Sequence, residues 1–360
     1  MNKKLGVFLV SAVLLLAVPL FVQQLGNGPV RIIDLALLYV LLALGLNIVV
    51  GYAGLLDLGY VAFYGVGAYV FALLSSQQLP QNFDFFAAHF PGGLHVPVWV
   101  VIPLGAALAA LFGVLLGTPT LKLRGDYLAI VTLGFGEIVR VFLNNLEDAP
   151  LNLTNGPRGI GQIDSVHLFG MDLGQSMHVF GFELPSVTLY YYFFLALVVV
   201  SVLICYRLEN SRIGRAWMAI REDEIAAKAM GINTRNMKLL AFGMGATFGG
   251  VAGTLFASFQ GFVSPESFSL QESIMIVAMV VLGGLGHIPG VILGALLLSA
   301  LPEVLRYLAP DLQDMTGGRI DAAILRQLLV ALAMIGVMLV RPRGLWPAPA
   351  HGKNAPGSVK

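Results

Sequence analysis

The stretch SRIGRAWMAIREDEIAAKAMG, from Ser211 to Gly231, is a charged interval between two long apolar runs. Ile213, Trp217 and Ile220 recur at a spacing that places them on one face of a helix, while Arg, Glu and Asp residues occupy much of the remaining surface. We therefore predict a short amphipathic helix outside the bilayer. Two interpretations stay open at this point: the helix lies in the lipid headgroups, or it is presented to another protein.

The rest of the chain is strongly apolar. Of its 360 residues 57% are hydrophobic and 11% are charged, and the mean hydropathy is +0.83, whereas soluble domains carry about a quarter charged residues. A helix that crosses the hydrocarbon layer needs about 20 mostly apolar residues, and a β-barrel would show short alternating segments instead. The composition indicates an all-α polytopic membrane protein with about ten (eight to ten) transmembrane helices.

The apolar segments lie near residues 5–22, 32–50, 58–76, 98–118, 127–143, 187–207, 239–260, 271–284, 288–305 and 324–340. The first has the charge and apolar core of a signal peptide, but no cleavage site follows, so we expect a retained first helix. The count of ten depends on 271–284 and 288–305, which only the stretch GLGHIPG separates. If these two form one kinked element, the C-terminus moves to the other side.

The placement of Lys and Arg orients the chain. With the N-terminus inside, 15 of the 21 Lys and Arg residues fall on the cytoplasmic side, which supports cytoplasmic N- and C-termini. We expect one transmembrane domain over residues 1–345 with a cytoplasmic loop at 208–238, outer loops at 77–97 and 144–185, and a disordered cytoplasmic tail at 346–360. The six Lys and Arg residues on the other side are Arg31, Arg140, Arg158, Arg306, Arg319 and Arg326.

Enzyme and metal motifs are missing from the sequence. There is no G-x-x-x-x-G-K-[ST] loop for ATP, no H-E-x-x-H and no G-x-S-x-G, so we expect no catalytic residue. The single cysteine, Cys205, excludes an intramolecular disulfide. His89, His95, His167 and His178 fall in the outer loops without tight ligand spacing, so we expect no metal site. The formal charge of +1 gives no support to nucleic-acid binding.

Two sets of glycines repeat at four-residue spacing. Small residues at this spacing let helix backbones approach closely in lipid, where hydrophobic association between helices is weak. We interpret both sets as helix-packing ladders rather than as a nucleotide loop. The ladders are Gly245, Gly249 and Gly253, and Gly286, Gly290 and Gly294.

Two further stretches are candidates for the translocation pathway. In the stretch that begins at Asn47, the helical pattern is interrupted by Gly51, Gly54 and Gly59, and we take Asn47, Gly51 and Gly54 as pathway candidates. Irregular backbone at membrane depth must be buried in protein or line water, although a solvated turn near Asp57 remains open. Glu137 and Arg140 are spaced to pair on one helix face. Charges near the bilayer centre cost about 2.5–3.5 kcal/mol on insertion scales, so they should face protein or water. A structural ion pair near the outer end is the alternative.

Four stretches together resemble the M-type membrane subunit of bacterial branched-chain amino acid ABC importers, in the family's order and over nearly the whole chain. Urea-type permease subunits share this architecture, and the motifs do not separate the two. The stretches are NIVVGYAGLLDLGYVAFYGVGAY (47–69), LRGDYLAIVTLGFGEIVR (123–140), SRIGRAWMAIREDEIAAKAMGI (211–232) and VVLGGLGHIPGVILGA (280–295).

The resemblance implies a heteromeric importer in the bacterial inner membrane. The expected partners are an H-type permease, two cytoplasmic ATPase subunits that bind the ATP, and an extracytoplasmic substrate-binding protein; this chain itself needs no cofactor. Residues 224–231 match the coupling helix that docks into the ATPase. The expected coupling residues are Arg215, Arg221, Glu222, Asp223, Glu224, Ala227, Lys228 and Gly231.

The expected mechanism divides the charged helix between two surfaces. Ile213, Trp217 and Ile220 would hold it to the membrane domain, the acidic turn would face the ATPase, and Gly231 would end the helix. The alternatives are a urea or short-chain amide permease and, from another class, a stand-alone secondary transporter or channel with Glu137 or Asp57 coupled to an ion. One sequence identifies neither the substrate nor the pathway residues, because half of the channel should come from a partner chain.

Overall fold

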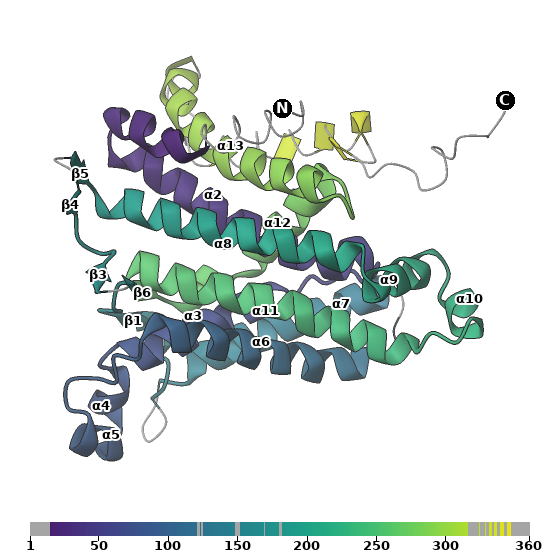
Figure 1. Cartoon of the computed structure of the whole chain (residues 1–360), viewed down its shortest axis with the longest axis horizontal. Helices are drawn as coiled ribbons and strands as arrows, with labels where there is room; N and C mark the ends of the chain where they lie inside the picture. The colour runs from purple at the N-terminus through teal and green to yellow at the C-terminus, as the bar shows by residue number, and fades with distance from the viewer. Residues whose placement is uncertain are drawn as a thin grey trace.

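The computed structural model describes residues 15–120, 123, 125–147, 152–168, 170–179 and 182–315. Beyond these it describes residues 324, 328, 331–332, 335–336, 339–341 and 344–346. The described part is predominantly helical, with helices running side by side along the long axis of the molecule (Figure 1). The predicted all-α membrane architecture is therefore confirmed.

Eight long helices overlap eight of the predicted apolar segments. The helix that begins the described region spans residues 15–22 and is followed by η1 (Gln23–Leu25). The last predicted segment, 324–340, lies mostly outside the described residues, so the count of ten stays a prediction. The eight are α2 (Asn27–Leu46), α3 (Val61–Ser75), α6 (Val98–Thr120), α7 (Asp126–Asn145), α8 (Ser186–Glu209), α11 (Thr234–Gln260), α12 (Leu270–Gly283) and α13 (Ile288–Met315).

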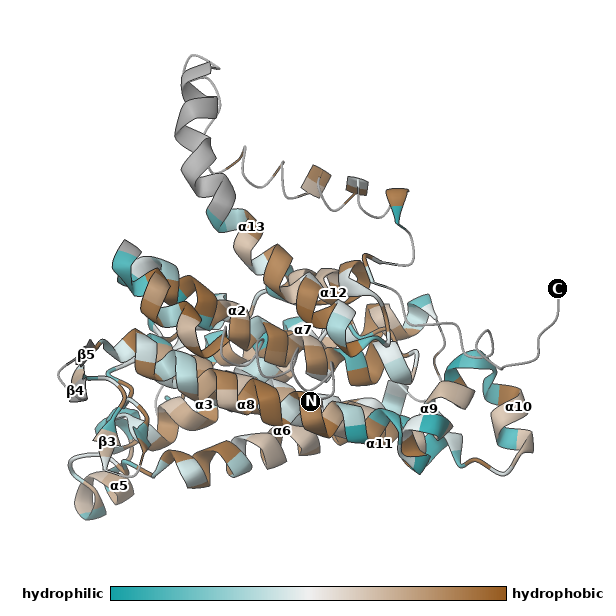
Figure 2. Cartoon of the chain, turned by 45° about the horizontal axis from the view of Figure 1, so that its top comes forward, coloured by the Kyte–Doolittle hydropathy of each residue, from teal (hydrophilic) through white to brown (hydrophobic). Residues whose placement is uncertain are grey.

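Length and hydropathy single out the membrane spans. Within the described ranges, four helical segments are long and apolar enough to cross a membrane, and α3, α12 and the first part of α13 are apolar but shorter. Hydrophobic residues run along these helices, whereas hydrophilic residues gather at α9 (Arg212–Glu222) and α10 (Glu224–Ala229) (Figure 2). The four segments are Asn27–Tyr52, Val98–Thr120, Ser186–Glu209 and Thr234–Gln260.

Glycines bring α11 close to its neighbours at the centre of the bundle. A Cβ atom at Gly253 would lie 2.1 Å from the carbonyl oxygen of Tyr64 in α3, and one at Gly245 would lie 2.4 Å from Cγ2 of Val49. A Cβ atom at Gly249 would lie 3.0 Å from that of Phe63. The predicted ladder on α11 therefore lies where helices touch, as packing in lipid requires.

The chain forms a helical hairpin over α12 and α13. The turn between them passes through Gly284 and Gly286, with φ of 122° and 79°, values that favour glycine. Added Cβ atoms at Gly283 and Gly294 would meet Gly290 and Met279 respectively, so the helices run antiparallel. The alternative of one kinked element is wrong. Gly290 and Gly294 lie in the hairpin contact, but Gly286 belongs to the turn rather than to the predicted ladder.

Short elements cover the end of the bundle opposite α9 and α10 (Figure 1). The first outer loop contains two short helices, and the strand β1 of the second outer loop pairs antiparallel with β6, which follows α11. This pairing ties the second loop to the end of the central helix. The elements are α4 (Gln78–Asn82), α5 (Asp84–His89), η3 (Gly156–Arg158), β1 (Ile160–Gly161), β2 (His167–Leu168), β3 (Met171–Asp172), β4 (Met177–Val179), β5 (Phe182–Leu184), β6 (Phe262–Val263) and η4 (Pro265–Phe268).

Candidate functional site

The helix α9 begins with a side-chain cap and buries one face. Ser211 Oγ accepts a hydrogen bond of 3.1 Å from the amide of Gly214, which satisfies one of the unpaired donors at the helix start. Trp217 and Ile220 are buried, and the indole Nε1 of Trp217 donates to the carbonyl oxygen of Met237 at 2.7 Å. The predicted apolar stripe therefore holds α9 against the start of α11, with Ile213 half-buried.

The predicted single helix over Ser211–Gly231 is wrong, because the helix breaks at Asp223. This residue is extended, with φ −154° and ψ 110°, and its Oδ1 accepts from the amides of Ile225 at 2.8 Å and Ala226 at 3.0 Å. Asp side chains favour such local bonds over helix interiors. Asp223 thus caps the separate helix α10 rather than continuing α9.

The end of α10 confirms the predicted role of Gly231 as a helix terminator. Gly231 has φ 85°, its amide donates to the carbonyl of Lys228, and the amide of Ile232 donates to that of Ala227. These two bonds form a Schellman motif, in which a left-handed residue satisfies the last carbonyls of the helix. Both ends of α10 are therefore fixed by local hydrogen bonds.

The outward surface of α10 is partly apolar. Ile225 is 70% exposed and Met230 83% exposed, whereas Ala227 is buried. Glu222, Asp223 and Lys228 are exposed beside them. Sequence reasoning missed Ile225 and Met230 because it continued one helix through Asp223. The aspartate before Glu224 was the signal that could have revealed the new helix start.

Two predicted coupling residues have partners within the chain. Glu224 Oε1 lies 2.7 Å from Nζ of Lys238, whose side chain is only 7% exposed, so this carboxylate neutralises a buried ammonium group. Arg215 Nη1 donates at 2.8 Å to the carbonyl of Asn210. The ion pair joins α10 to α11, and sequence reasoning missed Lys238.

A third predicted coupling residue with a partner within the chain is Arg221, an exposed residue near the end of α9. Its Nη1 donates to the carbonyl oxygen of Gly51 in η2 (Asn47–Tyr52), a π-helix that continues α2. Gly54, with φ 69°, lies so close that a Cβ atom there would be 2.8 Å from Cγ of Arg221. The structure therefore brings together residues that the sequence had assigned to two different sites.

The predicted pathway residues around η2 pack within this chain. Asn47 is buried, its Oδ1 accepts at 2.9 Å from the amide of Gly286, and Gly51 is buried beside it. Gly54 is exposed at the junction with α9. Their role in translocation stays a prediction.

The predicted pair of Glu137 and Arg140 forms on α7. Arg140 Nε lies 3.0 Å from Oε2 of Glu137, and Nη1 lies 3.8 Å from Oε1 of Glu266 in η4, a contact that the sequence did not reveal. Both side chains of the pair are about one third exposed. This geometry suits a structural ion pair near the outer end, and a role in transport also stays a prediction.

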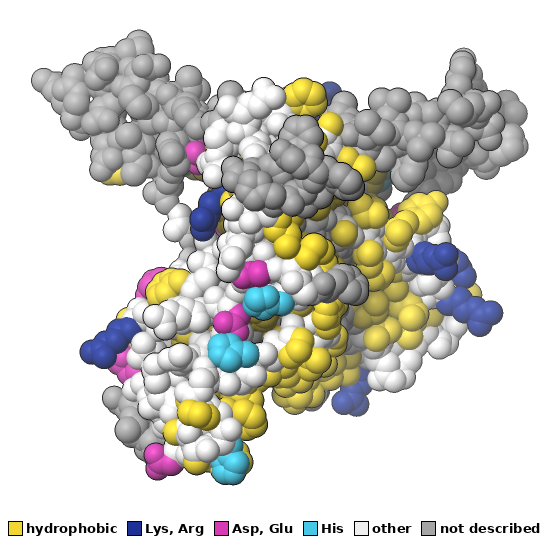
Figure 3. Space-filling view, turned by 60° about the vertical axis from the view of Figure 1, so that its left-hand side comes forward, with side chains coloured by type: hydrophobic (Ala, Val, Ile, Leu, Met, Phe, Trp, Pro, Cys, Tyr) yellow, Lys and Arg dark blue, Asp and Glu magenta, His cyan; other side chains and the backbone are white. Residues whose placement is uncertain are grey.

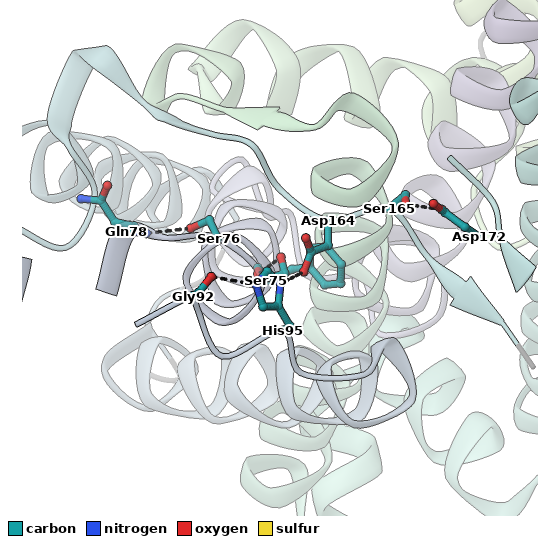
Figure 4. A network of polar contacts seen from close by, with 9 residues as sticks. Ser75, Ser76, Gln78, Gly92, His95, Asp164, Ser165 and Asp172 are labelled. Carbon is teal, nitrogen blue, oxygen red and sulfur yellow. Dashed lines mark hydrogen bonds and ion pairs between the residues drawn. The ribbon is translucent and has the colours of Figure 1, made fainter. Parts of the chain in front are cut away.

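The outer end of the molecule carries a second polar cluster. His95 Nδ1 lies 2.5 Å from Oδ2 of Asp164, and Nε2 lies 2.8 Å from the carbonyl of Gly92 (Figure 4). The hydrogen bond with Asp164, followed by that with Gly92, raises the pKa of His95. The amide of Asp164 donates to the carbonyl of Ser75 at 3.3 Å. The cluster thus joins the two outer loops.

Histidine and acidic side chains gather on this outer surface (Figure 3). Among the residues that the structure describes, no three His, Cys, Asp or Glu side chains are arranged to hold a metal ion. His95, Asp164 and His167 line a cavity of about 240 Å³ beside the start of α6.

Comparison with known proteins places the chain among transport proteins. Residues 28–339 match the family described as "Branched-chain amino acid transport system / permease component". The chain is 44% identical over 358 residues to the "High-affinity branched-chain amino acid transport system permease protein LivM" of Escherichia coli, covering 96% of this chain and 75% of the relative.

More distant relatives match over a similar length. The permease protein LivH of the same system in Escherichia coli is 27% identical over 89% of this chain and 96% of its own length. The "Probable branched-chain amino acid transport permease protein LivM" of Methanocaldococcus jannaschii is 25% identical over 86% of this chain and 90% of its own length. No solved structure matches the chain.

Proposed function

The chain belongs to the family of branched-chain amino acid transport system permease components, and on this premise we propose that it is the M-type permease subunit of an ATP-driven importer for leucine, isoleucine and valine. It would form half of the translocation pathway in the bacterial inner membrane, with both termini in the cytoplasm. An H-type permease would form the other half, since relatives named LivM and LivH both occur in Escherichia coli.

The main support for the proposal is that α9 and α10 are anchored to the membrane domain and also present exposed side chains. Trp217 and the pair of Glu224 with Lys238 fix this segment to α11, while Ile225 and Met230 remain exposed on α10. Large apolar side chains that are exposed on an ordered polar protrusion are typical of protein contact sites. We assign this surface to the groove of an ATPase subunit.

In this proposal the energy for transport comes from partner subunits. The sequence holds no P-loop, so ATP would be bound and hydrolysed by two partner subunits. Closure of the ATPases would tilt α9 and α10 as a unit and switch the pathway from outward to inward opening. An extracytoplasmic binding protein would deliver the substrate to the outer face.

Reconstitution in proteoliposomes tests the proposal. The chain together with its permease partner, ATPases and binding protein should transport leucine only when ATP is present on the side of the membrane where the ATPases bind. Import by the chain alone, without ATP, would instead establish a secondary transporter or channel. If the cognate binding protein binds urea and not leucine, the proposed substrate is wrong, whereas the proposed subunit composition is unaffected.

Two substitutions test the coupling surface within this assay. Glu224→Arg removes the carboxylate that pairs with Lys238, and Gly231→Pro breaks the Schellman motif at the end of α10. Both variants should remain in the membrane but lose coupling. If loaded binding protein still stimulates the ATPases in both variants, the assigned surface is wrong.

A further inference from the structure

Arg221 connects the segment outside the bilayer to a break in a transmembrane helix. Its guanidinium donates to Gly51, which lies 170 positions earlier in the chain and near the end of a continuous helical segment, Asn27–Tyr52. Arg221, Glu222 and Asp223 at the tip of α9 are all exposed, but only the guanidinium of Arg221 bonds to Gly51. Arg221 thus differs from its neighbours in bonding to the membrane domain.

The partner of Arg221 is an unusual piece of backbone. η2 is a π-helix in which the amide of Ala53 donates to the carbonyl of Ile48, and the amide of Leu55 donates to that of Val49. The last carbonyls of a helix lack intrahelical partners. π-helical turns are rare in proteins, and those that occur often lie at functional sites. A backbone carbonyl that is buried without a partner costs free energy, and Gly51 is buried, so the bond from Arg221 stabilises this conformation.

Glycines shape the surface on which Arg221 rests. Cβ atoms at Gly54 and Gly286 would lie 2.8 Å from Cγ and 3.0 Å from Nη1 of Arg221, respectively. Gly286 also donates its amide to Asn47 at the first residue of η2. Arg221 therefore contacts η2 and the turn between α12 and α13 at one point, where three separate parts of the chain meet.

The space beside this junction would let α9 and α10 move. A pocket of about 280 Å³ opens beside the contact between Arg221 and the loop after η2, and its lining includes Leu55, Arg221, Asp223, Glu224 and Lys238. Arg221 therefore lies between this pocket and the buried Gly51. A shift of α9 would act on η2 through the bond from Arg221 to Gly51.

We propose that Arg221 is a positioning residue that carries the movement of α9 and α10 to the π-helix η2, and not a contact to the ATPase. The inference rests on the proposed function, because it assumes that ATPases drive α9 and α10. It also divides the coupling residues: the outward side chains of α10 bind the motor, and Arg221 passes its movement into the bilayer.

The test compares Arg221→Gln, Arg221→Lys and Arg212→Gln in the complete importer. Arg221→Gln removes the charged donor, Arg221→Lys keeps a charge that can reach the same carbonyl, and Arg212→Gln neutralises an exposed arginine in the first turn of the same helix. Copurification of the ATPases and ATP-driven uptake of leucine are measured for each.

In Arg221→Gln the ATPases should still copurify, while uptake per ATP falls about tenfold or more, as expected when one charge-assisted hydrogen bond is lost from a two-state element. Arg221→Lys should recover part of the uptake, and Arg212→Gln should match the unaltered protein.

A second readout follows η2 directly. A thiol is placed in the π-helix by Val50→Cys in a Cys205→Ala background, and its reaction with a small methanethiosulfonate reagent is timed without nucleotide and with ADP and vanadate trapped in the ATPases. The rate should differ between the two states with Arg221 present and become equal in Arg221→Gln.

The outcomes separate the two proposals. A rate that still depends on nucleotide in Arg221→Gln, loss of the ATPases from that variant, or no nucleotide dependence in the unaltered protein would each overturn the role of Arg221. Failure of the unaltered complex to bind ATPases or to import would overturn the proposed function, and the role of Arg221 with it.

Discussion

The indole Nε1 of Trp217 donates a hydrogen bond of 2.7 Å to the carbonyl oxygen of Met237, and the side chain of Trp217 is fully buried. This contact joins α9 to the first turn of α11, the helix at the centre of the bundle. The contact therefore fixes α9 to the core of the membrane domain.

Trp217 should be a strong determinant of stability. Trp217→Ala removes a large buried side chain and should cost about 3–5 kcal/mol, whereas Trp217→Phe removes the hydrogen bond and one ring of the indole and should cost less, about 1–3 kcal/mol. The free energy of unfolding in detergent measures both. Trp99→Phe, at a position that is 49% exposed, serves as the control and should change little. Equal costs for Trp217→Ala and Trp99→Phe would contradict the anchoring role.

The pair of Glu224 and Lys238 should be asymmetric in a double-mutant cycle. Glu224→Gln leaves the buried ammonium of Lys238 without its carboxylate and should destabilise the protein by about 3 kcal/mol or more. Lys238→Met should cost less, because Glu224 can turn to water. The double substitution should recover most of the loss, since both charges are gone. Additive effects in the thermal unfolding of the four proteins would show that the two residues do not interact.

Alanine substitutions at two glycines within helices should differ in their effect on stability, according to the space around each glycine. Gly253→Ala places a methyl group 2.1 Å from the carbonyl of Tyr64, so α3 and α11 must separate, and we expect a loss of about 1–3 kcal/mol. Gly134→Ala on α7 meets nothing within 4 Å and serves as the matched control. Comparable melting temperatures for the two variants would refute the close packing of α11 on α3.

The contact between the outer loops should depend on pH. Bonding to Asp164, and then to the carbonyl of Gly92, raises the pKa of His95, so the protonated form favours the folded loops. This stabilisation is fully present below the unfolded value of about 6.5 and is lost as the pH rises through the raised pKa. The protection of the amides of residues 92–96 and 163–165, relative to their intrinsic exchange rates, should fall over that range.

His95→Gln should remove this pH dependence. His89→Gln is the control, because His89 bonds to the carbonyl of Phe85 rather than to an acid. A pH profile that His95→Gln leaves unchanged would contradict the role of the contact between His95 and Asp164.

The membrane helices could be predicted from the sequence because one physical rule governs them. About 20 apolar residues are needed to cross the bilayer, and the runs that became α6 and α8 were located to within about two residues at their ends. The turn between α12 and α13 was ambiguous, since GLGHIPG is compatible with a kink. Packing of Gly283 against Gly290 decides for a hairpin.

The arrangement of the coupling segment could be predicted only in part. Its apolar stripe and the terminating role of Gly231 follow from local spacing. The break at Asp223 was readable as a capping signal, but the periodicity through Ile220 favoured a continuous helix. The contact of Arg221 with Gly51 was beyond prediction, because it joins residues far apart in the chain and requires a π-helix that only tertiary packing selects.

The most direct test of the assignment of α10 to the ATPase is photo-crosslinking from position 225 in membranes that contain the complete complex. Ile225 is 70% exposed on α10, and a photoreactive residue there should form a product with the mass of this chain plus one ATPase subunit. The same residue at position 115 on α6, where Leu115 is 57% exposed on a membrane span, should give no such product. If position 225 crosslinks only to lipid, α10 lies in the headgroups and the assignment of this segment to the ATPase is contradicted.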